Sequence, residues 1–157
     1  MKYLTRMAAV AALAVLAACG SGQPDTAPRP SGGGNAVGGA SSSRSAVDTF
    51  LSTIRAGDLQ ALALIWGTAT GPARDQGMGR EELEQRELIM IWCINHDNAT
   101  VGSELPYGET GRAYQVTLHR GARSRTTTMY TIPSSNGRWY VENVDLDPAL
   151  RDFCRER

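Results

Sequence analysis

The sequence predicts an α+β domain in which N-terminal helices pack on a curved antiparallel sheet. Between residues 45 and 96, apolar residues recur three and four positions apart, which is the period of a helix with one buried face. From Asn98 onward the period changes to two, which is typical of strands that bury one face. Residues 44–157 are enough for one modest domain with a single core.

Two short helices are expected at the start of this domain. Residues 45–48 can cap the first helix, Gly57 suits a left-handed stop after it, and Asp58 can accept hydrogen bonds from the free amides of the second. Gly67 is expected to end the second helix. The buried stripes would consist of Val47, Phe50, Leu51 and Ile54 in the first helix, and of Leu59, Leu62, Ala63 and Trp66 in the second.

A third helix is expected over residues 80–96, after a loop over residues 68–79. Its first turns carry glutamates where the helix dipole favours negative charge, at positions 81, 82 and 84. Residues 88–94 are apolar nearly all round the helix. We therefore expect the C-terminal half of this helix to be deeply covered.

The second half of the domain is expected to be an antiparallel meander with one buried side. The strands are placed near residues 99–105, 112–120, 124–133 and 138–144. Its buried side would hold Tyr114, Val116 and Leu118 from the second strand, Tyr130 and Ile132 from the third, and Trp139 and Val141 from the fourth. Residues 148–157 would form a short turn of helix.

The N-terminus has the charge and hydropathy pattern of a secretory signal. Lys2 and Arg6 precede an apolar run over residues 7–18, which is 12 residues long and too short for the roughly 20 that cross a bilayer as a helix. The run ends in Leu16-Ala17-Ala18-Cys19, which resembles the lipobox of bacterial lipoproteins. In that family the cysteine thiol receives a diacylglycerol and the chain is cut just before the cysteine.

This resemblance implies an extracytoplasmic protein attached to the membrane by lipid at Cys19, with fatty acids such as palmitate. Because Gly20 rather than aspartate follows the cysteine, the outer membrane is implied if the host has two membranes. The alternative is an ordinary cleaved signal in which Cys19 is incidental.

Residues 19–43 are expected to form a disordered linker behind the anchor. Gly, Ser or Pro occupies 15 of the 24 positions from 20 to 43, so this segment has too little apolar surface to fold. Without Lys2 and Arg6 the chain carries 14 basic and 16 acidic residues, a net charge of −2. That balance argues against nucleic acid as a partner.

The remaining cysteines, Cys93 and Cys154, form an even pair in an oxidising compartment and are expected to make a disulfide. The alternatives are two unrelated buried thiols or, more weakly, a metal site. Neither cysteine has neighbours at metal-ligand spacing, and we expect neither a metal nor a cofactor.

The order of helices and strands resembles the nuclear transport factor 2-like cone fold, which ketosteroid isomerase and polyketide cyclases also share. The resemblance rests on the paired helices over residues 46–62 and on the closing strand over residues 137–144, GRWYVENV. The chain is similar to uncharacterised secreted members of that superfamily. In the enzymes of the family an aspartate base and a tyrosine donor project into the cone, but neither aligns onto this sequence, so no catalytic residue is assigned.

Several residues are candidates for binding. If the cone exists, its mouth would be lined by Trp66, Met90, Trp92, Tyr114, Tyr130 and Trp139, or these residues simply fill the core. The turn with Arg120, Arg123 and Arg125 could contact an anion or a partner protein, or be a solvated hairpin tip. His96 with Asp97 could form a base and its orienting carboxylate, but a helix-terminal histidine is favoured, and His119 is expected to face solvent.

The sequence leaves three functional hypotheses open. The favoured one is a non-catalytic envelope module that binds a small apolar ligand or an envelope protein. The second is an isomerase-like or cyclase-like enzyme, which requires an acid or base deep in the cone near a tyrosine hydroxyl. The third is a structural or assembly lipoprotein with a closed core. A homodimer through the sheet is a further candidate assembly.

Overall fold

The computed structural model describes residues 38–146 and 153–154, all of which lie within the compact unit Gly34–Arg157. The predicted signal sequence, Cys19, the predicted linker up to residue 37 and most of the C-terminal tail lie outside the described residues. Among the described residues, no helix is long and apolar enough to cross a membrane.

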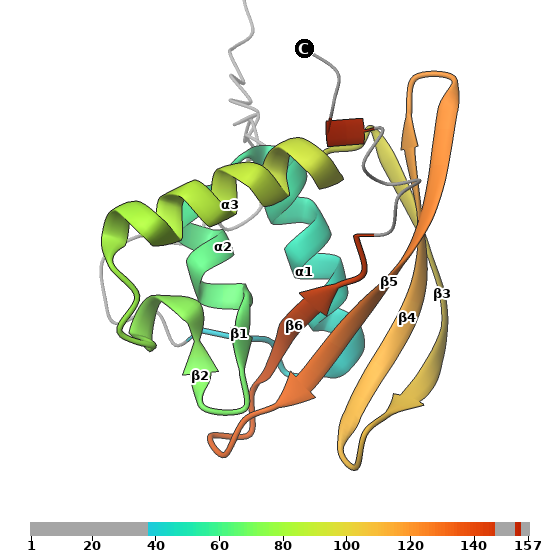
Figure 1. Ribbon diagram of the computed structural model, residues 1–157. Coiled ribbons are helices and arrows are strands. Elements are labelled where there is room, and N and C mark those ends of the chain that lie inside the picture. The colour runs from blue at the N-terminus through green and yellow to red at the C-terminus, as the bar shows by residue number, and fades with distance from the viewer. Residues whose placement is uncertain (1–37, 147–152, 155–157) are drawn as a thin grey trace, which may run out of the picture. The chain divides into compact units, whose positions relative to one another are not determined.

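Helices lie over one face of an antiparallel sheet (Figure 1). The helical half contains α1 (Ser43–Ala56), α2 (Leu59–Ile65), the short pair β1 (Gly67–Thr68) and β2 (Gly71–Pro72), the 3-10 turn η1 (Ala73–Asp75) and α3 (Arg80–Ile94). The sheet contains β3 (Asn98–Tyr107), β4 (Gly111–Arg120), β5 (Arg123–Pro133) and β6 (Trp139–Val144), in the order β3-β4-β5-β6. The predicted α+β class and the predicted meander are confirmed.

The ends of the first two helices follow from local capping. Gly57 adopts a left-handed φ of 66° after α1, and the Asp58 carboxylate accepts the Ala61 amide at 3.0 Å at the start of α2, both as predicted. The N-cap of α1 is Ser42 rather than a residue of the predicted segment 45–48. The Ser42 and Ser45 side chains form a capping box, so the helix begins one turn earlier than the apolar stripe indicates.

The folded part begins before residue 44, where we expected the linker to end. Ala40 pairs with Trp139 at the edge of β6, and the Gly39 amide donates to the Leu64 carbonyl at 2.8 Å. The buried Tyr140 hydroxyl donates to the Gly38 carbonyl at 3.2 Å. Residues 38–40 therefore bind the domain through their backbone groups, which a composition of small residues does not reveal.

The buried face of β5 is the opposite of the one expected. Tyr114 of β4 pairs with Met129, so Thr127, Met129 and Thr131 face the core together with the predicted Tyr114, Val116 and Leu118. Tyr130 lies on the other face, where its ring is 4.6 Å from that of Tyr107. Alternation identifies the two faces of a strand, but the cross-strand register decides which of them is buried.

The space between helices and sheet is filled by a continuous apolar core. Its fully buried members come from every layer and include Phe50, Ile54, Leu62, Ile94, Leu118, Met129 and Phe153. The space between the helical layer and the sheet is therefore mostly packed with side chains rather than hollow.

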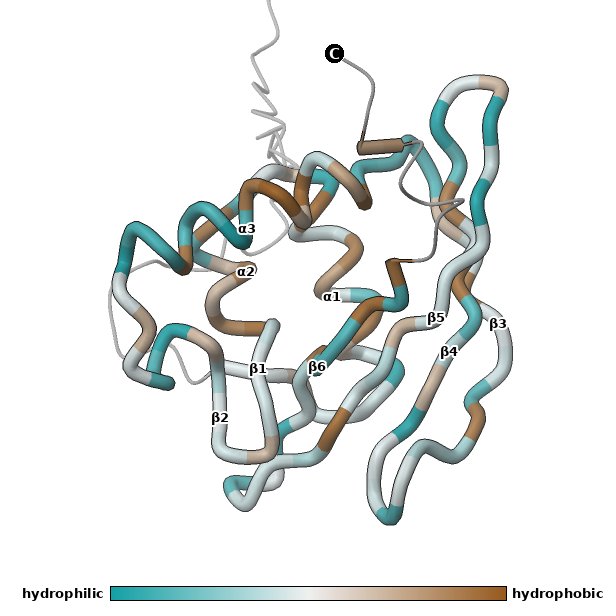
Figure 2. The backbone as a smooth tube through the Cα atoms, viewed as in Figure 1, coloured by the Kyte–Doolittle hydropathy of each residue, from teal (hydrophilic) through white to brown (hydrophobic). Residues whose placement is uncertain are grey.

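Only one face of α3 is buried, and the expectation that its C-terminal half is deeply covered is wrong. Leu88, Ile89 and Trp92 are 55%, 54% and 41% exposed. Figure 2 shows that hydrophobic residues are concentrated in the C-terminal half of α3. The helix contacts the rest of the domain through a single stripe that includes Leu83 and Ile94, and it ends at Ile94 rather than near residue 96. An apolar run does not force burial, and among residues 38–146 and 153–154 no second layer covers this face.

Candidate functional site

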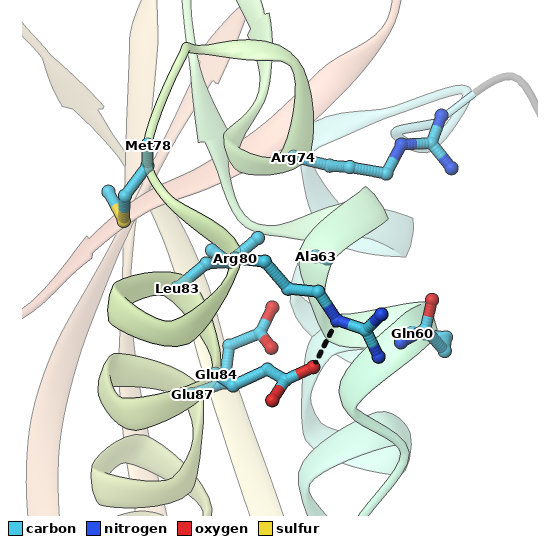
Figure 3. Close-up of a pocket in the computed structure, with 8 residues that line it drawn as sticks. All are labelled: Gln60, Ala63, Arg74, Met78, Arg80, Leu83, Glu84 and Glu87. Carbon is cyan, nitrogen blue, oxygen red and sulfur yellow. Dashed lines mark hydrogen bonds and ion pairs between the residues drawn. The ribbon is translucent and has the colours of Figure 1, made fainter.

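A groove of about 470 Å³ lies between α2 and α3 and is the largest of the described cavities (Figure 3). It is lined by Gln60 and Ala63 of α2, Arg74 of η1, Met78 of the following loop, and Arg80, Leu83, Glu84 and Glu87 of α3. Ala63 and Leu83 belong to a small apolar cluster of their own, against which Met78 packs. The groove thus combines a carbon floor with charged side chains.

Glu87 is the unusual member of this groove. Its side chain is 1% exposed, and its Oε1 has no hydrogen-bond partner within the described part of the chain. Burial, assisted by the negative charge of Glu84, raises the pKa of Glu87 to about 7 from an ordinary value of 4.5. Near neutral pH this side chain is therefore divided between a carboxylate and a carboxylic acid.

The other charges around the groove are already paired. The Arg80 guanidinium donates to Glu84 at 2.8 Å, one helical turn along α3, and the Arg74 guanidinium donates to Asp75 at 3.1 Å. Figure 3 shows the Arg80–Glu84 pair and Glu87 on the side of α3 that faces α2. Glu87 is consequently the groove carboxyl without a counter-charge of its own.

The sequence analysis does not identify Glu87 as a site residue, although its position in the helical pattern could have indicated it. Glu87 lies four residues after Leu83 and seven before Ile94, which places it on the buried stripe of α3. A charged residue on a buried stripe is a candidate for a functional site. The apolar run that follows it predicts burial of a face of α3 that the structure leaves exposed.

The six predicted pocket residues do not converge on one cavity. Trp66 and Met90 line a hollow of about 130 Å³ with Phe50, Ile94 and the end of β6. Tyr114 is fully buried and Tyr130 lies on the outer face. Trp92 is exposed on α3, and Trp139 lies at the edge of β6 with the Arg112 guanidinium 6.0 Å above its ring.

Within the described residues, a tyrosine hydroxyl contacts a carboxylate where Tyr114 of β4 pairs with Glu104 of β3. The Tyr114 hydroxyl and the Ser43 hydroxyl donate to the same oxygen of Glu104, and Arg112 donates to the other at 3.1 Å. These hydrogen bonds, that of Tyr114 foremost, lower the pKa of Glu104. An ionised carboxylate engaged by three donors holds α1 to the sheet and is poorly suited to act as a general base.

The arginines of the predicted anion site are engaged within the domain. Arg120 donates to the carbonyls of Trp92 at 3.1 Å and Asn95 at 2.8 Å, and so caps the end of α3. The guanidinium groups of Arg120, Arg123 and Arg125 lie 4.5, 5.5 and 5.7 Å from the Phe153 ring. This cluster holds the C-terminal segment against α3.

His96 and Asp97 do not form a base with an orienting carboxylate. His96 is buried, its ring Nδ1 lies 3.0 Å from the Ile94 carbonyl, and burial lowers the pKa of its imidazole. The Asp97 carboxylate instead accepts the Gly121 amide at 2.7 Å. His119 is half-buried, not fully exposed as expected, and its carbonyl accepts the Asp97 amide.

Cys93 of α3 and Cys154 of the tail form a disulfide, with Cα atoms 4.4 Å apart and a sequence separation of 61. Within the described residues, no group of three or more His, Cys, Asp or Glu is arranged to hold a metal ion.

No protein-family model matches the chain, and no curated protein matches it. A solved structure described as "Rd1NTF2_04 with long sheet" is similar in shape, with 15% sequence identity and a TM-score of 0.41. The match covers 66% of this chain and 97% of that chain. The described residues themselves define the class as a small α+β domain with a helical layer over a four-stranded antiparallel sheet.

Proposed function

We propose that this chain is a lipid-anchored envelope protein of the nuclear transport factor 2-like type, and that its domain is a non-catalytic binding module. We further propose that the groove between α2 and α3, rather than the interior of the cone, is its binding site. The observation that carries this proposal is the volume of the groove, about 470 Å³. Sites for small molecules in proteins span roughly 300 to 1,000 Å³.

The interior of the domain is less suited to a ligand. The hollow beside Trp66 and Met90 has about 130 Å³, well below the size of such sites. The cone-fold enzymes would also require an acid or base near a tyrosine hydroxyl at depth. Here the carboxylate that contacts Tyr114 belongs to Glu104, which is exposed at the end of β3. A binding role is therefore favoured over isomerase-like or cyclase-like catalysis.

The proposal of a lipid anchor is supported by Leu16-Ala17-Ala18-Cys19 and the charged and apolar segments before it. A disulfide between Cys93 and Cys154 is compatible with an oxidising compartment. Acyl chains contribute about 0.8 kcal/mol for each buried methylene, and two or more chains make attachment stable.

The anchor is tested by growing cells that express the chain with an alkyne-bearing fatty acid and analysing the mature protein by mass spectrometry. We expect a mature chain that begins at a lipid-modified Cys19, and a Cys19→Ala variant that takes up no label. An unmodified Cys19, or a retained leader, would contradict the anchor.

The groove is tested by nuclear magnetic resonance of the full chain titrated with a library of small fragments. Ligands should shift the amide resonances of Ala63, Leu83 and Glu87. A Gln60→Trp variant, whose new ring would cover the groove, should abolish these shifts, whereas Gln85→Trp, on an exposed position of α3 outside the groove, should preserve them. Fragments that shift only residues around the hollow would contradict the assignment.

A further inference from the structure

We infer that the groove between α2 and α3 takes a protonated amine with a short apolar body, with the Glu87 carboxylate as its counter-ion. This inference rests on the proposed function, since it names the chemical class of ligand for the same groove.

The first argument is the unpartnered acceptor. Glu87 Oε1 is buried without a hydrogen-bond partner in the described structure, although it lies in the lining of an open groove. An isolated buried carboxylate is expensive, because nothing replaces the water that it loses. A donor that enters the groove can supply the missing hydrogen bond, and a cationic donor also supplies the missing charge.

The second argument is the balance of charge. Arg74 pairs with Asp75, and Arg80 pairs with Glu84. These two pairs cancel, which leaves the groove with a single negative charge when Glu87 is ionised. A carboxylate or phosphate ligand would be repelled by the ionised Glu87, whereas a cation would neutralise its charge.

The third argument is the shape of the charged and apolar parts. Ala63, Leu83 and Met78 offer carbon to the body of a ligand, and Glu87 lies one turn beyond Leu83 on the same side of α3. A primary ammonium is compact and has three N–H donors, so one can reach Oε1 while the others remain toward water. A guanidinium instead presents a planar fork of donors that suits both oxygens of one carboxylate, and Oε1 is the Glu87 oxygen that lacks a partner among the described residues.

The test compares probes that differ mainly in the charge of the head group: n-butylammonium, n-butanol and n-butanoate. Each is titrated into the isotope-labelled full chain at pH 8, where Glu87 is ionised. Butylammonium should shift the Ala63, Leu83 and Glu87 amides saturably, with an affinity at least about tenfold higher than that of the other two probes. The affinity should fall by about fivefold at pH 6, since protonation of most of the Glu87 side chains removes the counter-ion.

Two variants separate the role of Glu87 from a general effect of charge. Glu87→Gln should weaken butylammonium binding by about tenfold or more, because the amide keeps the shape but loses the charge. Glu81→Gln, at an exposed position of the same helix outside the groove, should bind as the natural chain does. Equal butylammonium binding by Glu87→Gln would overturn the inference.

A measurement on the unmodified chain avoids any dependence on the variants. Saturating butylammonium should lower the titration midpoint of the Glu87 carboxyl carbon by about one pH unit, which is the linkage counterpart of the tenfold effect. An unchanged midpoint, or butanol or butanoate binding as tightly as butylammonium, would overturn the inference but leave the groove as a binding site. Failure of every probe and fragment to shift groove residues would instead overturn the proposed function.

Discussion

At the scale of the residue, Glu87 imposes a pH dependence on stability. Its pKa rises from 4.5 to about 7 on folding, so the folded state holds this proton more tightly than the unfolded state does. The free energy of unfolding must therefore fall as pH rises from about 4.5 to about 7 and then level off. At about 1.4 kcal/mol for each pH unit, the full contribution is about 3 kcal/mol.

Replacing Glu87 with glutamine should remove this contribution. We expect the difference in unfolding free energy between Glu87→Gln and the natural chain to increase in favour of the variant by about 3 kcal/mol between pH 4 and pH 8. Denaturant titrations at several pH values measure it. The Glu81→Gln variant should show no such trend, and a pH-independent difference for Glu87→Gln would contradict the assignment.

His96 gives the free energy of unfolding the opposite pH dependence to that of Glu87. For this reason the effect of Glu87 has to be measured as a difference between variants. Burial lowers the pKa of its imidazole, so the unfolded state takes up the proton first as pH falls below about 6.5. Stability due to neutral His96 is therefore lost toward acid, in the upper part of the same pH range. This contribution is common to the natural chain and to Glu87→Gln, and it cancels in their difference.

At the scale of the element, α3 performs two separate tasks. Its N-terminal half lines the groove with Arg80, Leu83, Glu84 and Glu87. Its C-terminal end is secured by the hydrogen bonds of Arg120 and by the disulfide at Cys93. The helix is thus anchored at the end away from the groove, and the paired charges near its beginning remain at the surface.

The start of α1 depends on Ser42, whose hydroxyl accepts the Ser45 amide at 3.2 Å. Ser42→Ala should lower the free energy of unfolding by about 1 kcal/mol, because an amide of the first turn loses its partner. The neighbouring, exposed Ser41→Ala serves as control and should change it by less than about 0.5 kcal/mol. Equal effects of the two substitutions in thermal or chemical denaturation would argue against the observed cap.

At the scale of the whole molecule, the disulfide joins the helical half to the C-terminal tail. The tail contributes Phe153, a fully buried member of the core, next to Cys154. Because the disulfide closes a loop of about 60 residues, the chain-entropy relation assigns it about 4 kcal/mol of stability.

We therefore expect a combined Cys93→Ser and Cys154→Ser variant to lose about 4 kcal/mol of unfolding free energy in chemical denaturation. The variant should match the natural chain once that chain is reduced. The pairing is tested directly by counting thiols in a Cys19→Ala chain, denatured without a reducing agent. No free thiol is expected, and two free thiols would refute the disulfide.

Much of the fold was accessible from local patterns. The left-handed Gly57, the cap at Asp58, the three helices and the four strands with their antiparallel order all depend on residues close in sequence. Spacing, turn residues and alternation report such features directly, because the period of a helix or strand is a local property.

The errors have a common physical origin in contacts between distant segments. The alternation of β5 puts Tyr130 and Ile132 on one face, which was expected to be the buried one, but the pairing of β5 with β4 turns Met129 to the core instead. Leu88 and Ile89 were expected to be covered, but both are exposed, and no layer within the described part of the chain lies over them. Residues 38–40 were assigned to a linker, yet their backbone groups bind Leu64, Trp139 and Tyr140.

The candidate site also combines features that are local in sequence with features that depend on distant segments. The residues that line the groove come from α2, η1, the following loop and α3, and no spacing in the sequence indicates that they share one cavity. The position of Glu87 on the apolar stripe of α3 can be read from the sequence, but the lack of a hydrogen-bond partner for its Oε1 among the described residues cannot. By itself, the sequence determined the kinds of elements, their order and the expected anchor at Cys19. Only the tertiary structure decided which faces are buried and that Glu87 has no counter-charge, because burial and pairing depend on what neighbouring segments supply.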